Sequence, residues 1–173
     1  MELFGAQGGR ILHLDLQLAA FDRDVVLSDA SAYNIQFVGA RPVFIDTLSF
    51  GRYRDGDFWS GYRQYCEQFL NPLLLRALVG VPHNAWYRGS FEGIPSADLG
   101  RMIPWRRRLS RNVLIHVLLH GALERSASGG AVQKDAEMVR GGLPRPAYRR
   151  MLLGLRKWIA KLTPAERRLS LIH

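Results

Sequence analysis

The chain has a single cysteine, Cys66, among its 173 residues, so it cannot form an internal disulfide. This excludes a small secreted domain stabilised by disulfide bonds and fits a reducing compartment. No apolar run reaches the roughly 18 to 20 residues needed to cross a bilayer, because charged residues interrupt every candidate. The first ten residues contain an acidic residue, Glu2, and lack the apolar segment of a secretory signal. We therefore expect a cytoplasmic protein.

Acidic residues are scarce in the second part of the chain. Residues 1–100 carry 8 Lys or Arg against 11 Asp or Glu, whereas residues 101–173 carry 16 against 4. A charge excess of this size favours an anionic partner, such as nucleic acid, an anionic membrane or an acidic protein domain. The chain has no RNP, zinc-knuckle or helix-turn-helix signature, which argues against nucleic acid.

The composition is that of a folded globular domain, with 47% hydrophobic and 23% charged residues. Residues 10–21 are rich in apolar side chains, and both a helix and an alternating strand fit part of this run. Residues 35–38 and 43–45 predict a short β-hairpin around a turn at 39–42, with Pro42 at a strand boundary.

Helical spacing dominates the rest of the chain. Residues 59–78 predict a helix that Pro72 kinks or divides, and the Gly- and Pro-rich residues 79–100 predict a loop-rich connection. Asn112 is the expected N-cap of a further helix of about three turns. Together with the hairpin, these segments predict an α+β fold that is mainly helical.

The last part of the chain predicts a basic amphipathic helix that opens at Pro146. Its apolar face runs from Tyr148 to Leu162, and its basic residues lie largely on the other face. Packing of this helix on the rest of the fold and binding to an anionic membrane, with Trp158 at the interface, are both open. Residues 163–166 form a capping box that begins another helix.

Three polar residues around the hairpin carry the candidate chemistry. Asp29 is followed five residues later by Asn34, and Asp46 follows the second strand of the hairpin. This pattern resembles the catalytic segment of protein kinases and aminoglycoside-type phosphotransferases. The resemblance implies a kinase-like C-terminal lobe. It also implies that Asp29 orients the attacking hydroxyl and that Asn34 and Asp46 bind Mg²⁺.

Structural roles for the same residues stay open. Asp29 fits a turn cap, Asn34 fits a left-handed backbone position, and Asp46 fits a strand end. Only 28 residues precede Asp29, which leaves no room for a glycine-rich strand pair with its phosphate-binding lysine. The segment Gly5 to Gly9 lacks the ending of a P-loop. Because of the resemblance to kinases, a Mg²⁺-dependent phosphotransferase acting on a small molecule remains an alternative function, even though these phosphate-binding parts are missing.

A second resemblance covers residues 12–122. The run YNIQFVGARPVFIDTLSF, followed by FWSGYRQYCEQFLNPLLL, FEGIPSADLGRMIP and NVLIHVLLH, is similar to the N-terminal part of a bacterial family of S-adenosylmethionine-dependent methyltransferases related to nodulation proteins. In that family the methyl-transfer domain is a Rossmann-like unit farther along the chain, with its own glycine-rich motif. Residues 123–173 contain no such motif, so the resemblance implies a chain shortened at both ends. S-adenosylmethionine is expected only in the missing downstream domain.

We therefore expect a kinase-like region at 1–125, a flexible linker at 126–145 and a basic helical extension at 146–173. The expected function is that of an accessory or substrate-positioning region of a methyltransferase-family protein, with that domain or another protein as partner. A basic module that binds a membrane or nucleic acid is a third hypothesis, carried by the basic residues of the helix predicted from Pro146 (Arg149, Arg150, Arg156 and Lys157).

Two weaker candidate sites remain. His116 and His120 share a helix face at the spacing of a zinc-binding pair, but no third ligand is evident, so we expect a structural role. The run from Arg106 to Arg108 beside Trp105 fits phosphate or an acidic partner domain, and it also fits a solvated surface.

Overall fold

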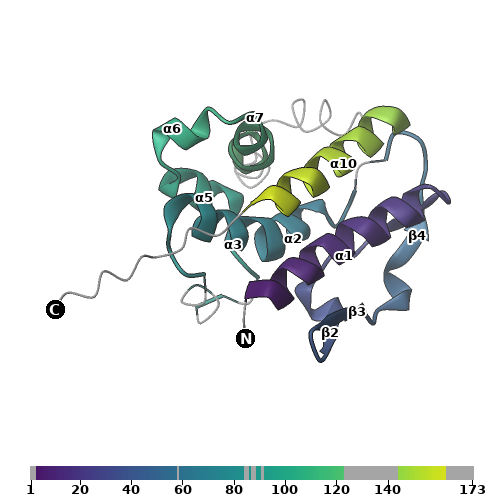
Figure 1. Cartoon of the computed structure of the whole chain (residues 1–173). Helices are drawn as coiled ribbons and strands as arrows, with labels where there is room; N and C mark the ends of the chain where they lie inside the picture. The colour runs from purple at the N-terminus through teal and green to yellow at the C-terminus, as the bar shows by residue number, and fades with distance from the viewer. Residues whose placement is uncertain are drawn as a thin grey trace.

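The structure is a computed structural model that describes residues 3–57, 59–83, 86, 89–90, 92–122 and 144–162. Within these ranges the fold is α+β and mainly helical, as the sequence predicts (Figure 1). The helices are α1 (Leu3–Phe21), α2 (Tyr62–Tyr65), α3 (Asn71–Leu74), α5 (Ser96–Met102), α6 (Trp105–Arg108), α7 (Arg111–Val113) and α10 (Arg145–Lys161). The strands are β1 (Val25–Leu27), β2 (Ile35–Val38), β3 (Arg41–Phe44) and β4 (Phe50–Arg52). The label η marks the short 3-10 helices η1 (Ala32–Asn34) and η2 (Thr47–Ser49), and the π-helical segments η3 (Cys66–Leu70), η4 (Leu75–Val79) and η5 (Leu114–Leu119).

Residues 10–21, for which helix and strand were both open, lie in helix α1. Leu14, Leu18 and Phe21 are buried at helical spacing, which places them on one face against the core. The helix ends in a tight turn at Asp24, whose φ of 59° is the only positive φ of a non-glycine residue in the described part of the chain.

The strands form two separate antiparallel pairs. β1 pairs with β4, so that Leu27 lies opposite Phe50, and β2 pairs with β3 in the predicted hairpin. The turn is tighter than predicted: Gly39, with a φ of 62°, and Ala40 connect the strands, and Pro42 lies within β3 opposite Phe37. Proline is accommodated there because both strands of a two-stranded sheet are edge strands.

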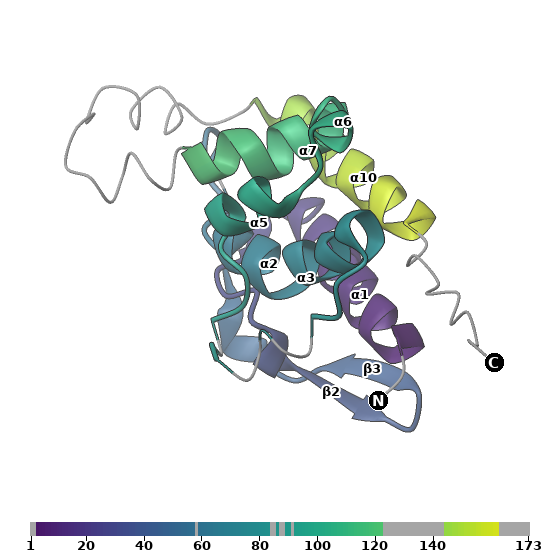
Figure 2. The same cartoon turned by 90° about the vertical axis from the view of Figure 1, so that its left-hand side faces the viewer.

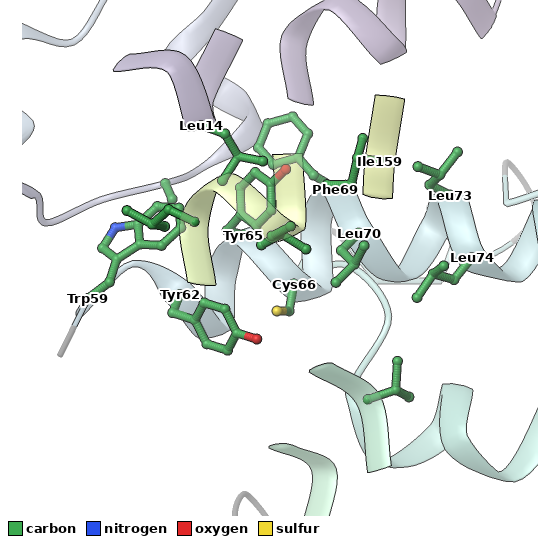
Figure 3. Close-up of a cluster of buried hydrophobic side chains, with 14 of the residues drawn as sticks. Leu14, Trp59, Tyr62, Tyr65, Cys66, Phe69, Leu70, Leu73, Leu74 and Ile159 are labelled. Atoms are coloured by element: carbon green, nitrogen blue, oxygen red, sulfur yellow. The ribbon is translucent and has the colours of Figure 1, made fainter. Parts of the chain in front are cut away.

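The central helix runs from Tyr62 to Val79 through α2, η3, α3 and η4. Pro72 neither ends nor divides it. Proline has no amide hydrogen to donate to the preceding turn, and the wider π-helical turn of η3 directly before it accommodates this. Gly80, in the left-handed conformation, closes the helix. Figure 3 shows the large buried side chains of this helix together with Leu14 from α1 and Ile159 from α10.

Helices α5, α7 and η5 pack beside the central helix. The predicted N-cap at Asn112 is wrong: Ser110 occupies the cap position and Asn112 lies inside the first turn. The loop-rich connection ends earlier than predicted, because α5 begins at Ser96. A Cβ atom at Gly121 would lie 2.8 Å from the Ala97 amide nitrogen. Helix α5 and the helix that continues from η5 through Gly121 therefore approach closely at this glycine.

Helix α10 packs antiparallel against α1 (Figure 1). Its predicted apolar face is buried in the same core, through Tyr148, Leu152, Leu155 and Ile159. This outcome confirms packing on the fold as the role of that face. Helix α10 begins at Arg145, one residue before the predicted start.

Ion pairs join α10 to α1 and the turn that follows it. Arg149 Nε lies 2.9 Å from Asp22 Oδ1, and Arg156 pairs with Asp15 through both carboxylate oxygens. Arg145 pairs with Asp24 and donates to the Phe21 carbonyl at 2.8 Å. Part of the charge excess of the second half is therefore balanced by acidic residues of the first. The predicted capping box at 163–166, and all of the predicted linker except Pro144 and Arg145, lie outside the described residues.

Candidate functional site

Asp29 lies in the loop after β1. Two side chains of the central helix hold this loop through hydrogen bonds to its backbone. The amides of Ala30 and Ala32 donate to Gln64 Oε1 at 2.9 Å and to Gln68 Oε1 at 2.7 Å. Asp29 Oδ1 accepts from the Ser31 amide at 2.7 Å, which is the geometry of a turn cap. The carboxylate is half-buried.

Asn34 ends the short helix η1 at the base of the hairpin. Its carbonyl accepts from the Ile45 amide at 2.9 Å, one step beyond the last residue pair of β2 and β3. Its Nδ2 is buried and has no hydrogen-bond partner in the described part of the chain. The left-handed backbone position considered for Asn34 is wrong, because among the described non-glycine residues only Asp24 has a positive φ.

Asp46 caps the short helix η2. Its Oδ1 accepts from the Leu48 amide at 2.9 Å, and its Oδ2 accepts from the Ser49 hydroxyl. These bonds favour the charged carboxylate, and the pKa of Asp46 is therefore lowered, with the Ser49 hydrogen bond as the largest cause. Both oxygens of Asp46 thus hold local backbone and side chain in place.

The strand pairs bring the three residues to one region. Leu27 lies opposite Phe50, and beyond that pair the Ser28 amide and hydroxyl donate to the Ser49 carbonyl at 2.7 and 2.9 Å. Ser49 in turn donates to Asp46, so the loop of Asp29 and the cap of Asp46 are linked through two serines. The Ile45 amide joins Asn34 to the same region.

Carboxylate and amide oxygens are ligands of the type that Mg²⁺ prefers. Asp29 Oδ2 and the Asn34 side-chain oxygen are available for this role, since no hydrogen bond to either atom is present within the described residues. Asp46 fits less well, because a bound ion would have to share oxygens that already accept two hydrogen bonds. Within the described residues no three His, Cys, Asp or Glu side chains come together as metal ligands.

Sequence reasoning missed His13, which lies in α1 beneath this region. The ring is fully buried, edge-on to Phe44 with centroids 5.5 Å apart and against Phe69 at 4.9 Å. Desolvation lowers the pKa of His13 to about 4, although the Gly9 carbonyl and the Asp29 carboxylate act in the opposite direction. Neither ring nitrogen makes a well-aligned hydrogen bond within the described part of the chain. His13 is therefore a neutral side chain under the hairpin.

His116 and His120 serve the core rather than a shared ligand. His116 Nδ1 lies 2.5 Å from the Tyr62 hydroxyl, and His120 Nδ1 lies 3.2 Å from the Ser96 hydroxyl. Burial lowers the pKa of each histidine to about 4, so both are neutral. The hydrogen bonds tie η5 and the turn after it to the central helix and α5. This agrees with the structural role expected for the pair.

Large apolar side chains lie exposed around the hairpin, a feature that the sequence analysis did not identify. We call the exposed apolar residues of this segment together the hairpin surface, although Phe37 and Val38, adjacent in β2, lie on its two faces: Tyr33, Phe37, Val38, Ile45, Leu48 and Phe50. Leu48 is 92% exposed and Val38 is 71% exposed. A folded monomer rarely leaves this many large side chains uncovered in so short a segment. The alternation of the strands was visible in the sequence, but which face would stay uncovered was not.

Comparison with known proteins gives one relationship. The chain is 43% identical over 158 residues to the nodulation protein NoeA of Rhizobium meliloti (strain 1021). The chain is therefore similar to a part of NoeA. The match covers 91% of this chain and 33% of NoeA, so the chain spans about a third of the length of the curated relative that it matches. No protein-family model matches the chain, and no solved structure matches it significantly.

The relationship to NoeA confirms the predicted link to nodulation proteins. Methyl transfer, S-adenosylmethionine, the kinase-like lobe and the catalytic roles of Asp29, Asn34 and Asp46 stay predictions. Of the helices in the described ranges, none is both long and apolar enough to cross a membrane.

Proposed function

We propose that this chain is an accessory, substrate-positioning region of a nodulation-related methyltransferase. In this proposal the chain binds the rest of such a protein through the hairpin surface, and methyl transfer from S-adenosylmethionine takes place in the bound partner. The relative NoeA is about three times as long as the segment that this chain matches, so it contains enough further chain to be such a partner.

The observation that carries the proposal is the exposure of the hairpin surface. Leu48, Val38 and Tyr33 are each more than half exposed, at 92%, 71% and 62%. The segment 33–50 contains one Arg and one Asp, so its net charge is zero. Both hairpin strands are edge strands, since β2 and β3 form a two-stranded sheet. An apolar segment of zero net charge at the edge of a sheet suits a protein partner.

The polar residues around the hairpin support a positioning role for this region. Asp29 caps a turn and Asp46 caps η2, so each carboxylate holds the backbone that carries the exposed side chains. Leu48, the most exposed of them, donates its own amide to Asp46. The constellation predicted from the sequence thus shapes the hairpin surface.

The test is binding of this chain to the part of NoeA that lies outside the match, measured by calorimetry. Wild type is expected to bind, and the double variant Val38→Ser with Leu48→Ser is expected to bind at least roughly 10-fold more weakly. Leu109→Ser, which removes a leucine elsewhere whose exposure of 79% lies between those of Val38 and Leu48, is the control and should bind as wild type.

A lack of binding by the wild-type chain would contradict the proposal, as would an equal loss in the Leu109→Ser control. The same calorimeter tests the methyltransferase claim: the remaining part of NoeA should bind S-adenosylmethionine, whereas this chain alone should not.

A magnesium-dependent phosphotransferase is the second candidate, and it is favoured by Asp29, whose Oδ2 accepts no hydrogen bond in the described part of the chain and whose loop is linked to Asp46 through Ser28 and Ser49. Its test is Mg²⁺-dependent nucleotide binding by Asp46→Ala and Ser49→Ala. If Asp46 binds the ion, Asp46→Ala abolishes nucleotide binding and Ser49→Ala retains it, since Ser49→Ala frees the carboxylate oxygen. Absence of nucleotide binding by wild type rejects this candidate.

A further inference from the structure

A second group of exposed apolar side chains lies on the consecutive elements α6, α7 and η5. We call it the helical corner: Trp105, Leu109, Leu114, Ile115 and Leu119, with the exposed arginines Arg106, Arg107 and Arg111. Leu109 is 79% exposed and Trp105 is 68% exposed. Figures 1 and 2 both place α6 at the far end of the molecule from the hairpin of β2 and β3.

The charge of the helical corner has one sign. Residues 99–123 contain five arginines and no Asp or Glu. The two histidines of this segment are neutral, because burial lowers the pKa of each to about 4. This surface combines exposed leucine and tryptophan side chains with arginines from a segment that has no acidic residue. It therefore favours a partner that has an apolar interior and an anionic surface.

The arginines are arranged for an external partner. Arg106 stacks over the Trp105 ring at 5.3 Å, which places a cation beside an aromatic side chain that is 68% exposed. Arg106 and Arg107 form no salt bridge with an acidic side chain in the described part of the chain. Arg108 instead donates to the carbonyls of Ile103 and Arg101 and so fixes the turn between α5 and α6.

A pocket of about 310 Å³ adjoins the corner between α5 and η5. Its charged lining residues are both arginines, Arg101 and Arg108, while Ser96 and small or aliphatic residues line the rest. Both arginines already have partners within the described residues, since Arg101 pairs with Asp98 at 3.3 Å and Arg108 donates to backbone carbonyls. The anionic contact is therefore assigned to Arg106, Arg107 and Arg111.

The basic face predicted from the sequence, on α10, is arranged differently. The apolar side of α10 lies in the core, and Arg149 and Arg156 form ion pairs with Asp22 and Asp15. Exposed apolar side chains and unbalanced charge therefore coincide at the helical corner and not on α10.

We propose that the helical corner docks on an anionic lipid surface, with Trp105 and Leu109 entering the head-group region and Arg106, Arg107 and Arg111 facing the lipid phosphates. Phosphatidylcholine vesicles with and without about a third phosphatidylglycerol provide the test, by flotation of the full chain. Wild type is expected to float only with the anionic vesicles, and less so as salt is raised.

Two variants of the helical corner separate charge from apolar insertion. Arg106→Gln with Arg107→Gln should weaken vesicle binding by roughly 10- to 30-fold, and Trp105→Ser with Leu109→Ser by at least as much. These side chains are exposed, so the variants should melt as wild type does.

The matched control is Arg150→Gln with Lys157→Gln, which removes the same charge from the exposed side of α10 and should change binding by less than about 3-fold. Three results would overturn the proposal: no binding of wild type to anionic vesicles, an equal loss in the α10 control, or a dimer in solution that Trp105→Ser with Leu109→Ser disrupts. Binding of an acidic protein that depends on the corner, without vesicle binding, would assign it to that class of partner instead.

Discussion

The hairpin surface and the helical corner expose apolar side chains to a similar degree but differ in charge. Residues 33–50 carry one Arg and one Asp, whereas residues 99–123 carry five arginines and no acid. The two surfaces lie at opposite ends of the molecule (Figures 1 and 2). Apolar exposure alone would assign both to the same kind of partner. The charge separates them: the neutral surface suits a protein, and the basic one suits an anionic lipid surface.

A buried neutral histidine lies beneath the hairpin and two more lie beside the corner, and their titration gives the largest predicted effect, a loss of stability in acid. Burial lowers the pKa of His13, beneath the hairpin, and of His116 and His120, beside the corner, to about 4 from 6.5. The unfolded state therefore binds more protons than the folded state between these values. Stability is complete above pH 6.5 and is lost as the pH falls towards 4, by about 2 kcal/mol for each histidine near pH 5.

Chemical denaturation between pH 7.5 and 4.5 measures this loss. The variant His13→Leu should lose less stability on acidification than wild type, because one of the titrating groups is gone. If the free energy of unfolding stays constant across this range, the histidines are not buried in the neutral form. The packing described for His13 beneath the hairpin and for His116 and His120 beside the corner would then be wrong.

The hairpin surface and the helical corner share one hydrophobic core, so we expect the protein to unfold as one cooperative unit. Leu155 of α10 is buried in the core that holds α1 and the central helix together. Leu155→Ala should lower the free energy of unfolding by about 2–5 kcal/mol. Circular dichroism and tryptophan fluorescence should report the same transition midpoint. Two separate transitions would mean that the ends of the molecule unfold independently.

The smallest effect is predicted for the paired charges of α10. Arg149→Gln breaks the exposed ion pair with Asp22, and the melting midpoint should change by no more than the error of the measurement. Vesicle flotation should also be unchanged, since this charge is already balanced. A loss of vesicle binding in this variant would move the anionic contact from the corner to α10.

Sequence patterns predicted the elements whose side chains repeat regularly. The alternation of residues 35–45 gave the hairpin, and the amphipathic run after Pro146 gave α10 with its buried face. The spacing of Asp29, Asn34 and Asp46 around the hairpin correctly indicated that the three residues lie in one region.

Other features depend on contacts that no local pattern contains. Asn112 has the chemistry of an N-cap, but Ser110 occupies the cap position and the helix begins two residues earlier than predicted, at Arg111. His13 is buried by Phe44 and Phe69, which come from distant parts of the chain. Leu48 and Leu109 read as ordinary apolar residues, and only the tertiary fold leaves them exposed.

The most direct test of the division between the two surfaces is a crossed binding measurement. Val38→Ser with Leu48→Ser and Arg106→Gln with Arg107→Gln are each measured against two partners: the part of NoeA outside the match, and anionic vesicles. The account predicts that the hairpin variant loses only NoeA binding and the corner variant loses only vesicle binding. If either variant loses both partners, or if the losses are exchanged, the proposed division between the surfaces is contradicted.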